Sequence, residues 1–295
     1  MTRSLKSVII FLVLNLGALS GMAGCLPSKR LTVGCAGMLV EDVAKASAKQ
    51  TDVSLIAEGS PAYLMLLDGM VEAYPEERRL LLAAAEAYRS YAAIQTARGN
   101  AERASRLYIR GKDYALRAMD QEEEFRSILS QPVDALAVYV SSFSKKDVPA
   151  LFSFAGCWAG WIGANPESVR AMADLPRVVL LMERVIALEE THDYGGAHLF
   201  MGIYKSAVPP VYGGKPEEAR WHFERAIEIG RGDFLMAYVY YADHYARKML
   251  KRDLFIDLLT KVIESPVDRI PELALINTIA RTRAEEMLNH GEDYF

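Results

Sequence analysis

The spacing of apolar residues after residue 36 constrains the fold of this chain more than any other feature. Apolar side chains recur at intervals of three and four residues almost everywhere, and sustained alternation of polar and apolar residues is almost absent. The first pattern puts apolar residues on one face of an α-helix, whereas a half-buried strand needs the second. We therefore expect an all-α fold of about a dozen helices, separated by proline and glycine residues that break the pattern. The prolines among these breaks are Pro75, Pro132, Pro149, Pro166, Pro176, Pro266 and Pro271.

Two neighbouring pairs of segments near the C-terminus share one repeat pattern. The tetratricopeptide repeat is a helix-turn-helix unit of about 34 residues, with small and aromatic residues at fixed places in both helices. Segment 215–229 matches its second helix, because Ala219, Phe223 and Ala226 follow the spacing A-x3-F-x2-A. Segment 197–205 supplies the first helix, with Gly202 where the two helices approach. The pattern continues downstream through Leu235, Tyr238, Tyr241, Ala242 and Tyr245, and then through Leu254, Leu258 and Ile263.

The same pattern recurs upstream with insertions. A predicted helix over 62–74 ends at Pro75 and is followed by Leu81, Ala84, Ala85 and Tyr88 at the spacing of a first repeat helix. The helix that returns carries Ala104, Tyr108 and Gly111, and segments 147–162 and 175–190 make a more divergent pair. We expect about four helix pairs with flanking helices, stacked as a superhelix within a single domain over residues 36–295. The alternative is a large helical bundle in which these spacings are coincidental.

The first 24 residues have the pattern of a secretory signal peptide. Arg3 and Lys6 precede an apolar run over 8–19, which is shorter than the roughly 20 residues of a membrane-spanning helix. Small residues then lead to Cys25, and the sequence Met22-Ala23-Gly24-Cys25 resembles a bacterial lipobox. We expect residues 1–24 to be removed, Cys25 to be lipidated and residues 25–35 to form a tether. The alternative is a soluble secreted protein in which Cys25 is a plain thiol.

Charge and cysteine content narrow the possible partners. Lysine and arginine number 34 against 38 acidic residues, for a net charge of −4, and the basic residues are interspersed with acidic ones. This distribution argues against a nucleic-acid partner. After removal of the signal peptide, Cys35 and Cys157 remain in a compartment that permits disulfides. The sequence leaves two alternatives open: the two cysteines form a bridge, or Cys157 is a small buried residue in an apolar helix.

No pattern in the chain predicts catalysis, a metal site or a cofactor. No nucleophile elbow, phosphate-binding loop or dinucleotide fingerprint is present. The acidic runs at 122–124 and 189–190 are interpreted as solvated helix faces, and Gly156, Gly160 and Gly163 as sites of close helix contact. We therefore expect a protein that is not an enzyme. The histidines lack the spacing of metal ligands on one helix face; they are His192, His198, His222, His244 and His290.

A few residues nevertheless have the composition of a binding surface. Segment 152–161 is rich in glycine and aromatic residues, and it contains Trp158 and Trp161. The loop over 206–215 is longer than a repeat turn requires, and Pro209-Pro210 stiffens it. A superhelix of helix pairs has a concave face that can bind peptides or apolar ligands. The candidate ligand- or partner-binding residues are Trp158, Trp161, His198, Tyr204, Pro209 and Pro210.

Several of these segments together resemble the TatT family of tetratricopeptide-repeat lipoproteins, which are associated with tripartite ATP-independent periplasmic (TRAP) transporters. The resemblance covers nearly all of the mature chain, with Met22 and residues 231–233 as departures. It implies a non-enzymatic periplasmic lipoprotein that pairs with the transporter's solute-binding protein, self-associates as a trimer and presents a groove or pore to an apolar ligand. The segments that carry it are His198-x3-Gly202-Ile203-Tyr204, the loop from Val208 to Glu217, Ala219-x3-Phe223-x2-Ala226, Val239-Tyr240-Tyr241-Ala242-x2-Tyr245-Ala246-Arg247, and residues 81–91.

The resemblance and the spacing together predict a periplasmic adaptor that is tethered to a membrane through Cys25. We expect it to bind the solute-binding protein and to assist uptake of a hydrophobic ligand. One alternative is a general envelope scaffold without ligand transport. Another is a helical lipoprotein hydrolase, for which the sequence provides no evident nucleophile and base.

Overall fold

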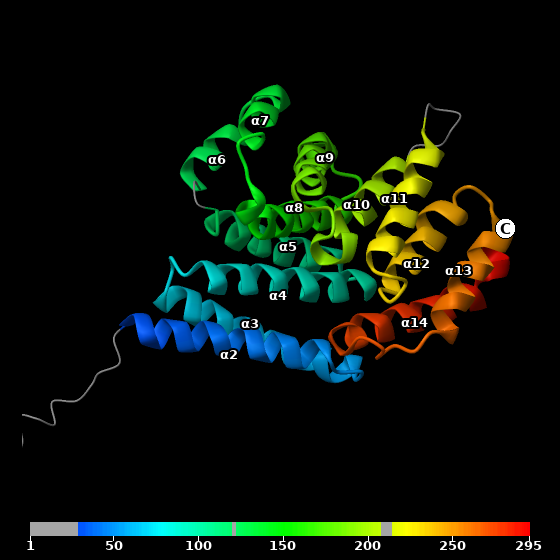
Figure 1. Ribbon diagram of the computed structural model, residues 1–295, viewed down its shortest axis with the longest axis horizontal. Helices are drawn as coiled ribbons and strands as arrows, with labels where there is room; N and C mark the ends of the chain where they lie inside the picture. Colours follow the sequence, from blue (N-terminus) through cyan, green and yellow to red (C-terminus); the bar gives the residue numbers. More distant parts are fainter. Residues whose placement is uncertain (1–28, 120–121, 208–213) are drawn as a thin grey trace, which may run out of the picture. The chain divides into compact units, whose positions relative to one another are not determined.

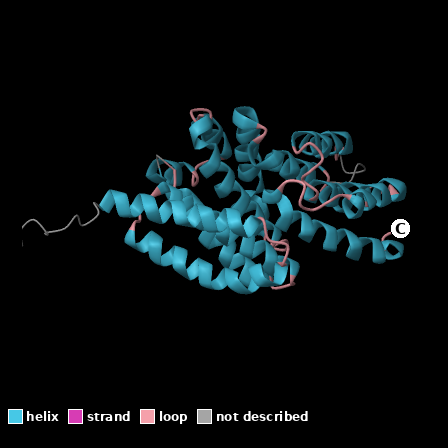
Figure 2. Cartoon of the chain, turned by 60° about the horizontal axis from the view of Figure 1, so that its bottom comes forward, coloured by secondary structure: helices cyan, strands magenta, loops and turns pink. Residues whose placement is uncertain are grey.

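The computed structural model describes residues 29–119, 122–207 and 214–295, and of residues 29–36 it describes the backbone alone. These residues form thirteen α-helices with short 3-10 and π turns, and no strand occurs among them (Figures 1 and 2). The predicted all-α class is confirmed. The signal peptide and Cys25 lie outside the described residues.

The chain divides into two compact units, residues 1–39 and residues 40–295. Helix α2 (Lys29–Ala48) contains the division. It begins inside the segment predicted to be a tether, so residues 29–35 are helical. The boundary between tether and domain at residue 36 stays a prediction. Residues 40–295 carry the helix pairs and are the part of the chain described below.

Four helix pairs account for most of this unit, and each pair packs as an α-hairpin. Their positions agree with the predicted repeats, apart from the beginning of one helix. The pairs are α4 (Arg78–Ala97) with α5 (Ala101–Arg117), α8 (Val148–Gly163) with α9 (Val169–Glu189), α10 (Gly196–Lys205) with α11 (Pro216–Ile229), and α12 (Met236–Tyr241) with α13 (Arg252–Glu264).

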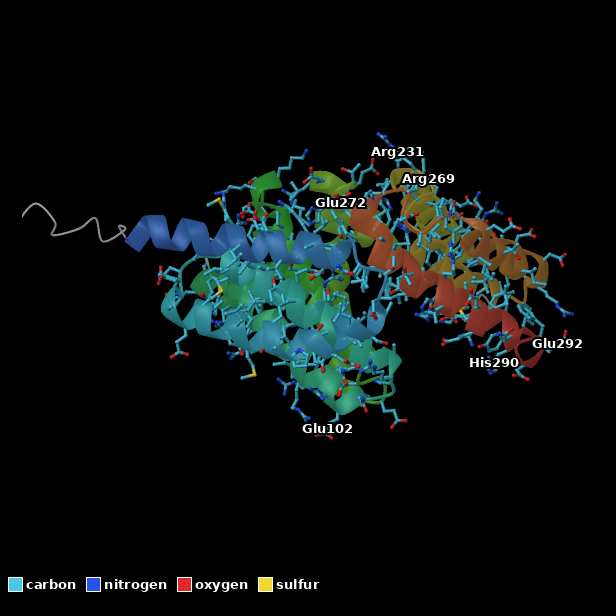
Figure 3. All side chains as sticks on the ribbon, turned by 90° about the horizontal axis from the view of Figure 1, so that it is seen from below. Glu102, Arg231, Arg269, Glu272, His290 and Glu292 are labelled. Carbon is cyan, nitrogen blue, oxygen red and sulfur yellow. The ribbon has the colours of Figure 1, made fainter. Side chains whose placement is uncertain are left out.

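Four further helices flank or interrupt these pairs. Helix α14 contacts both α13 and α3, so the last helix of the chain packs near the first helix of the unit (Figure 1). An ion pair of 3.2 Å between Lys49 Nζ and Glu272 Oε1 joins the same two regions. Figure 3 labels Glu272. These helices are α3 (Val53–Ala73), α6 (Glu122–Ile128), α7 (Val133–Val140) and α14 (Ala274–Asn289).

Two helices begin earlier than the sequence predicted, and both contain a proline. Helix α9 begins at Val169 and runs through Pro176, which was predicted to be a break. Ser168 caps it by accepting a hydrogen bond from the Ala171 backbone NH at 3.3 Å. Pro176 is exposed, so water can reach the carbonyl whose hydrogen bond is lost, and the buried face of α9 outweighs that loss. Helix α3 likewise begins at Val53 rather than 62 and contains Pro61.

Buried repeat positions form the core as predicted. Ala219, Phe223 and Ala226 are each 0% exposed. A Cβ atom on Gly202 would lie 2.9 Å from the Phe223 ring, so the glycine lets α10 contact α11 closely. Between the first and second pairs, a Cβ on Gly111 of α5 would lie 3.0 Å from Sγ of Cys157 in α8. Cys157 is a buried free thiol in that contact, which agrees with the alternative of a small buried residue.

Helix α12 continues directly into a π-helical turn, Ala242–Ala246. The Arg247 backbone NH bonds to the Ala242 carbonyl at 2.9 Å, five residues back. This wider turn places Asp243 in the interior, where it is 9% exposed. Its carboxylate pairs with Arg247 at 2.5 Å and with Arg283 of α14 at 2.7 Å. The π turn thereby links the last repeat pair to the C-terminal helix.

Candidate ligand- and partner-binding sites

Trp158 and Trp161 lie together with a lysine on the contact between α5 and α8. Lys112 Nζ lies 4.6 Å from the centroid of the Trp158 ring and 5.8 Å from that of Trp161. The indole NH of Trp158 donates to Asp174 Oδ2 of α9 at 3.2 Å. These four residues are named the tryptophan–lysine site. Its geometry is that of a cation held over aromatic faces.

Close helix approach builds this site. A Cβ atom on Gly160 would lie 2.3 Å from Tyr108 Cε1, so α8 meets α5 only because residue 160 lacks a side chain. Lys112 stands one helical turn after Tyr108, which brings its side chain over the two indoles. Burial lowers the pKa of Lys112, with Asp174 acting in the opposite direction. Trp161 is half-buried, whereas Trp158 is 4% exposed. Trp161 is therefore the more solvent-exposed of the two indoles.

His198 belongs to a second cluster, which joins α9, α10 and α11. Its side chain is 0% exposed, and its Nδ1 lies 2.9 Å from His222 Nδ1. Its Nε2 lies 3.3 Å from Glu190 Oε2, and Arg225 donates two hydrogen bonds to the same carboxylate. Glu190, His198, His222 and Arg225 are named the histidine site. The hydrogen bonds from Arg225 lower the pKa of Glu190.

The partners of His198 fix its protonation. Glu190 is an ionised acceptor, so His198 Nε2 carries the proton and Nδ1 accepts from His222. Burial lowers the pKa of His198, while Glu190 raises it. Burial, and then His198, lower the pKa of His222 to about 4. Both imidazoles are therefore neutral near pH 7, and their interaction is a hydrogen bond between helices.

This arrangement predicts a loss of stability in mild acid. A histidine whose pKa is lower in the folded protein than in the unfolded chain makes the free energy of unfolding depend on pH. The folded protein is most stable above the unfolded pKa of about 6.5, and this stability is lost as pH falls toward the folded pKa. We expect His222→Gln to remove about 1–2 kcal/mol of the fall in unfolding free energy between pH 6.5 and 4. Urea unfolding at several pH values measures this. His244, whose pKa burial also lowers to about 4, accounts for part of the fall that remains.

The exposed His290 is the matched control for this prediction. Among the described contacts, its ring contacts the Glu286 carbonyl of the preceding helix and no side chain of another helix. His290→Gln should leave the pH profile unchanged. A profile that is the same for His222→Gln and wild type would contradict the assignment of the proton-sensitive step to the histidine site.

The remaining predicted residues are divided between described and undescribed parts of the chain. Tyr204 of α10 is half-buried and stacks on Phe200, with ring centroids 6.4 Å apart. Pro209 and Pro210 lie outside the described residues. The structure therefore brings Trp158 and Trp161 together, and it places His198 in a different side-chain network.

A third cluster lies at the turn between α9 and α10 and was not among the predicted sites. Arg89 of α4 lies 3.7 Å from Asp193 and over the Phe152 ring at 5.7 Å. Asp193 and Tyr194 both have positive φ, of 49° and 54°, a strained conformation for two successive residues other than glycine. Burial raises the pKa of Asp193 even though its side chain is 45% exposed. Gly195-Gly196 was the signal in the sequence for this turn.

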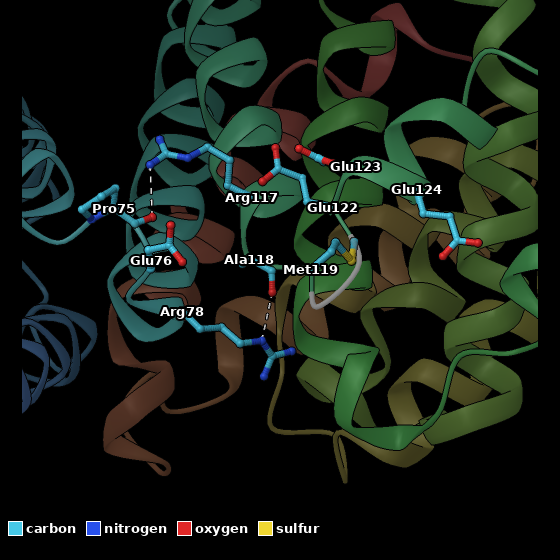
Figure 4. A pocket seen from close by; sticks show the side chains of 9 residues that line it. All are labelled: Pro75, Glu76, Arg78, Arg117, Ala118, Met119, Glu122, Glu123 and Glu124. Atoms are coloured by element: carbon cyan, nitrogen blue, oxygen red, sulfur yellow. Dashed lines mark hydrogen bonds between the residues drawn. The ribbon is translucent and has the colours of Figure 1, made fainter.

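An open cavity of about 750 Å³ lies where the turn after α3 meets the end of α5 (Figure 4). Arg78 Nε donates to the Ala118 carbonyl at 3.0 Å and Arg117 Nη2 to the Pro75 carbonyl at 3.3 Å, so the two arginines brace its wall (Figure 4). The acidic run at 122–124 lines its rim, in agreement with the predicted solvated face. Its surface is charged rather than apolar.

These features define a class: a helix-hairpin repeat protein whose conspicuous side-chain clusters lie where its helices contact one another. In the residues that the structure describes, no cluster of three or more histidine, cysteine, aspartate or glutamate residues could hold a metal ion. None of the described helices is both long and apolar enough to cross a membrane.

Comparison with known families identifies the chain more closely. The family of the TRAP transporter T-component (TAtT) matches residues 49–295, and the chain belongs to this family. A protein of Treponema pallidum (strain Nichols), which carries the name "Uncharacterized protein", is 23% identical over 278 residues. That alignment covers 86% of this chain and 84% of the relative. The predicted resemblance is confirmed, and the chain is associated with TRAP transporters through its family.

Proposed function

We propose that this protein binds the solute-binding protein of a TRAP transporter and assists uptake of an apolar ligand, without catalysing a reaction. The observation that carries the proposal is the family match, which spans the whole series of helix pairs. Repeat proteins of this type use extended faces to bind partners and ligands. The histidine site supports a role without catalysis, because both imidazoles are engaged in hydrogen bonds between helices.

Binding of the solute-binding protein is tested directly with purified components. The mature chain is titrated at micromolar concentration with the solute-binding protein encoded beside it, and calorimetry measures the heat of binding. A saturable complex is expected. A solute-binding protein from an unrelated transporter is the control. Absence of binding at these concentrations would contradict the transporter function and favour a general envelope scaffold.

The tryptophan–lysine site is proposed to contact the apolar ligand. The chain has three tryptophans, and two of them belong to this site, so Trp221→Phe leaves fluorescence from the site alone. Dodecanol as an apolar probe should shift that emission to shorter wavelength, because the partly exposed Trp161 loses water. Adding Trp161→Phe should abolish most of the shift. An unchanged spectrum over the soluble range of the probe would remove this site from the proposal.

Membrane attachment is proposed to depend on the lipid at Cys25. Cys25→Ser removes the acylated group, and we expect the protein to move from the membrane fraction to the soluble fraction. Its thermal unfolding should be unchanged, because Cys25 precedes residues 40–295, which form the compact helical unit. Fractionation followed by immunoblotting measures the distribution. Sedimentation of Cys25→Ser with membranes would contradict a tether at this residue.

We also propose that the protein self-associates, with a trimer as the assembly that the family resemblance implies. Sedimentation equilibrium of the mature chain gives the mass of the assembly directly. Three copies are expected, and a monomer at all accessible concentrations would contradict self-association.

A further inference from the structure

Lys112 of the tryptophan–lysine site has no direct counter-ion among the described residues. Its side chain is half-buried, and its Nζ lies over three aromatic rings, with Phe154 at 6.0 Å in addition to the two indoles. None of the residues that the structure describes forms a hydrogen bond or an ion pair with this ammonium. The rings stabilise the cation, but they do not neutralise it. A cation that is partly removed from water in this way is stabilised further by an anionic partner.

Asp174 acts on Lys112 without pairing with it, because other groups hold its carboxylate. The Trp158 indole NH donates to Oδ2 at 3.2 Å, and Arg177 Nη1 lies 3.8 Å from Oδ1. Burial lowers the pKa of Lys112, Asp174 partly opposes this effect, and the charge of Arg170 adds to it. The ammonium is therefore left without the closed ion pair that a buried lysine usually has.

Apolar side chains adjoin Lys112 where α5 meets α8. Ser105, Ile109 and Lys112 follow one another at intervals of four and three residues, which puts them on one side of α5. Both ends of this row contact the α8 region, because Asn165 Nδ2 donates to Ser105 Oγ at 2.9 Å and Lys112 lies over the indoles. Ile109 lies between these ends and is 48% exposed, and Trp161 of α8 is half-buried. An apolar side chain of each helix is thus accessible beside the cation.

The row has the length of an apolar chain of several methylene groups. From Ser105 to Lys112, seven residues at 1.5 Å each give about 10 Å. A molecule along the row would place its chain against Ile109 and Trp161 and its head group at Lys112. Because one ammonium is available and Asp174 adds a negative charge to its surroundings, a singly charged head group fits better than a dianion.

We propose that the ligand of the tryptophan–lysine site is an amphiphile with a carboxylate head group, which pairs with the Lys112 ammonium while its chain lies against Trp161 and Ile109. This inference rests on the proposed function and names the chemical class of the ligand. The charge-assisted hydrogen bond from Lys112 selects the anion, and the apolar side chains bind the chain. Since the ammonium is half-buried, a slender molecule reaches it more readily than the surface of a folded protein does.

Two probes of equal chain length separate the contribution of the head group from that of the chain. Dodecanoate and dodecanol are titrated into the Trp221→Phe chain near pH 7, within the soluble range of each probe, and the shift of tryptophan emission gives both dissociation constants. We expect dodecanoate to bind more tightly by about tenfold or more. Equal affinities would overturn the carboxylate head group and leave the apolar ligand of the proposed function standing. Binding of neither probe would overturn both.

Substitution of Lys112 tests the partner of the carboxylate. Lys112→Met keeps an unbranched side chain without the charge, so it should abolish the preference for dodecanoate and leave the affinity for dodecanol unchanged. Lys112→Arg keeps a cation and should retain a preference. Lys261→Met removes the same charge from an exposed position of α13 and is the matched control. A preference for dodecanoate that persists in Lys112→Met would overturn the pairing.

A variant at an exposed position keeps the test independent of folding. Ile109→Glu adds a carboxylate beside the proposed path of the chain, and the exposed side chain is not part of the core. We expect it to weaken dodecanoate binding by about tenfold, with an unchanged melting temperature. Unchanged binding would overturn the placement of the chain along α5.

The solute-binding protein provides the competing outcome. Lys112→Met should bind it with the affinity of wild type in calorimetry. A lower affinity of this variant, together with equal affinities of wild type for the two probes, would overturn the ligand in favour of an acidic surface on the partner. Failure of wild type to bind the solute-binding protein would contradict the transporter function, whereas the preference for dodecanoate is measured without that partner.

Discussion

Replacing Phe223 with alanine is expected to lower the free energy of unfolding by about 3–5 kcal/mol, because a fully buried phenyl ring is removed. The ring is 0% exposed and stacks on Tyr241, with centroids 5.2 Å apart. It also fills the space over Gly202, where α10 and α11 meet. The cavity would open between two helices that neighbouring side chains cannot draw together. Urea unfolding followed by far-ultraviolet circular dichroism measures the change.

Trp221, two residues earlier on the same helix, provides the control. Its side chain is 55% exposed, so Trp221→Ala should cost about 1 kcal/mol. A Phe223→Ala variant with wild-type stability would show that the A-x3-F-x2-A positions do not form the core of this pair.

Introducing a methyl group at Gly160 is the second change with a large expected effect. A Cβ there would lie 2.3 Å from Tyr108 Cε1 and 2.5 Å from Cζ, so the ring or the α5–α8 contact must shift. Tyr108 is 7% exposed, which leaves the ring little room to move. We expect Gly160→Ala to lower the unfolding free energy by about 1–3 kcal/mol, measured by urea unfolding, despite the better helix propensity of alanine.

Gly163 lies three residues later on α8 and has nothing within 4 Å of its Cβ position. Gly163→Ala should therefore leave stability unchanged or raise it by up to about 1 kcal/mol. Opposite signs at the two glycines are the expected result. Equal effects would mean that Tyr108 does not pack on Gly160.

The repeat pairs could be predicted because their signals are local. The spacing of Ala219, Phe223 and Ala226 depends on one helix, and Gly202 depends on its nearest partner. The predicted α10 and α11 agree with the structure to within one residue at both ends. Such signals are strong because a small and a large residue must occupy fixed places when two helices pack.

The starts of α3 and α9 could not be predicted in this way. A proline inside a helix costs one hydrogen bond, and tertiary packing decides whether the helix continues. Pro176 is exposed while Val178 and Leu181 are buried, so the balance favours an unbroken α9. The caps Asp52 and Ser168 were visible in the sequence and would have given both starts.

The candidate sites were predicted only in part, because each depends on residues from several helices. Segment 152–161 indicated Trp158 and Trp161, but Lys112 belongs to α5 and carries no signal of its own. His198 was selected without its partner His222, which lies 24 residues away in sequence. The cluster of Arg89 and Asp193 depends on strained backbone, which spacing does not reveal.

The π turn at Ala242–Ala246 has a consequence for comparing this protein with its relatives. A π turn contains one residue more than the α-helical turn that it replaces, and the helices on either side of it need not move. A relative with an α-helix here would be one residue shorter in this segment and would show a gap in an alignment. That gap would record a change of winding within a helix rather than a lost piece of loop.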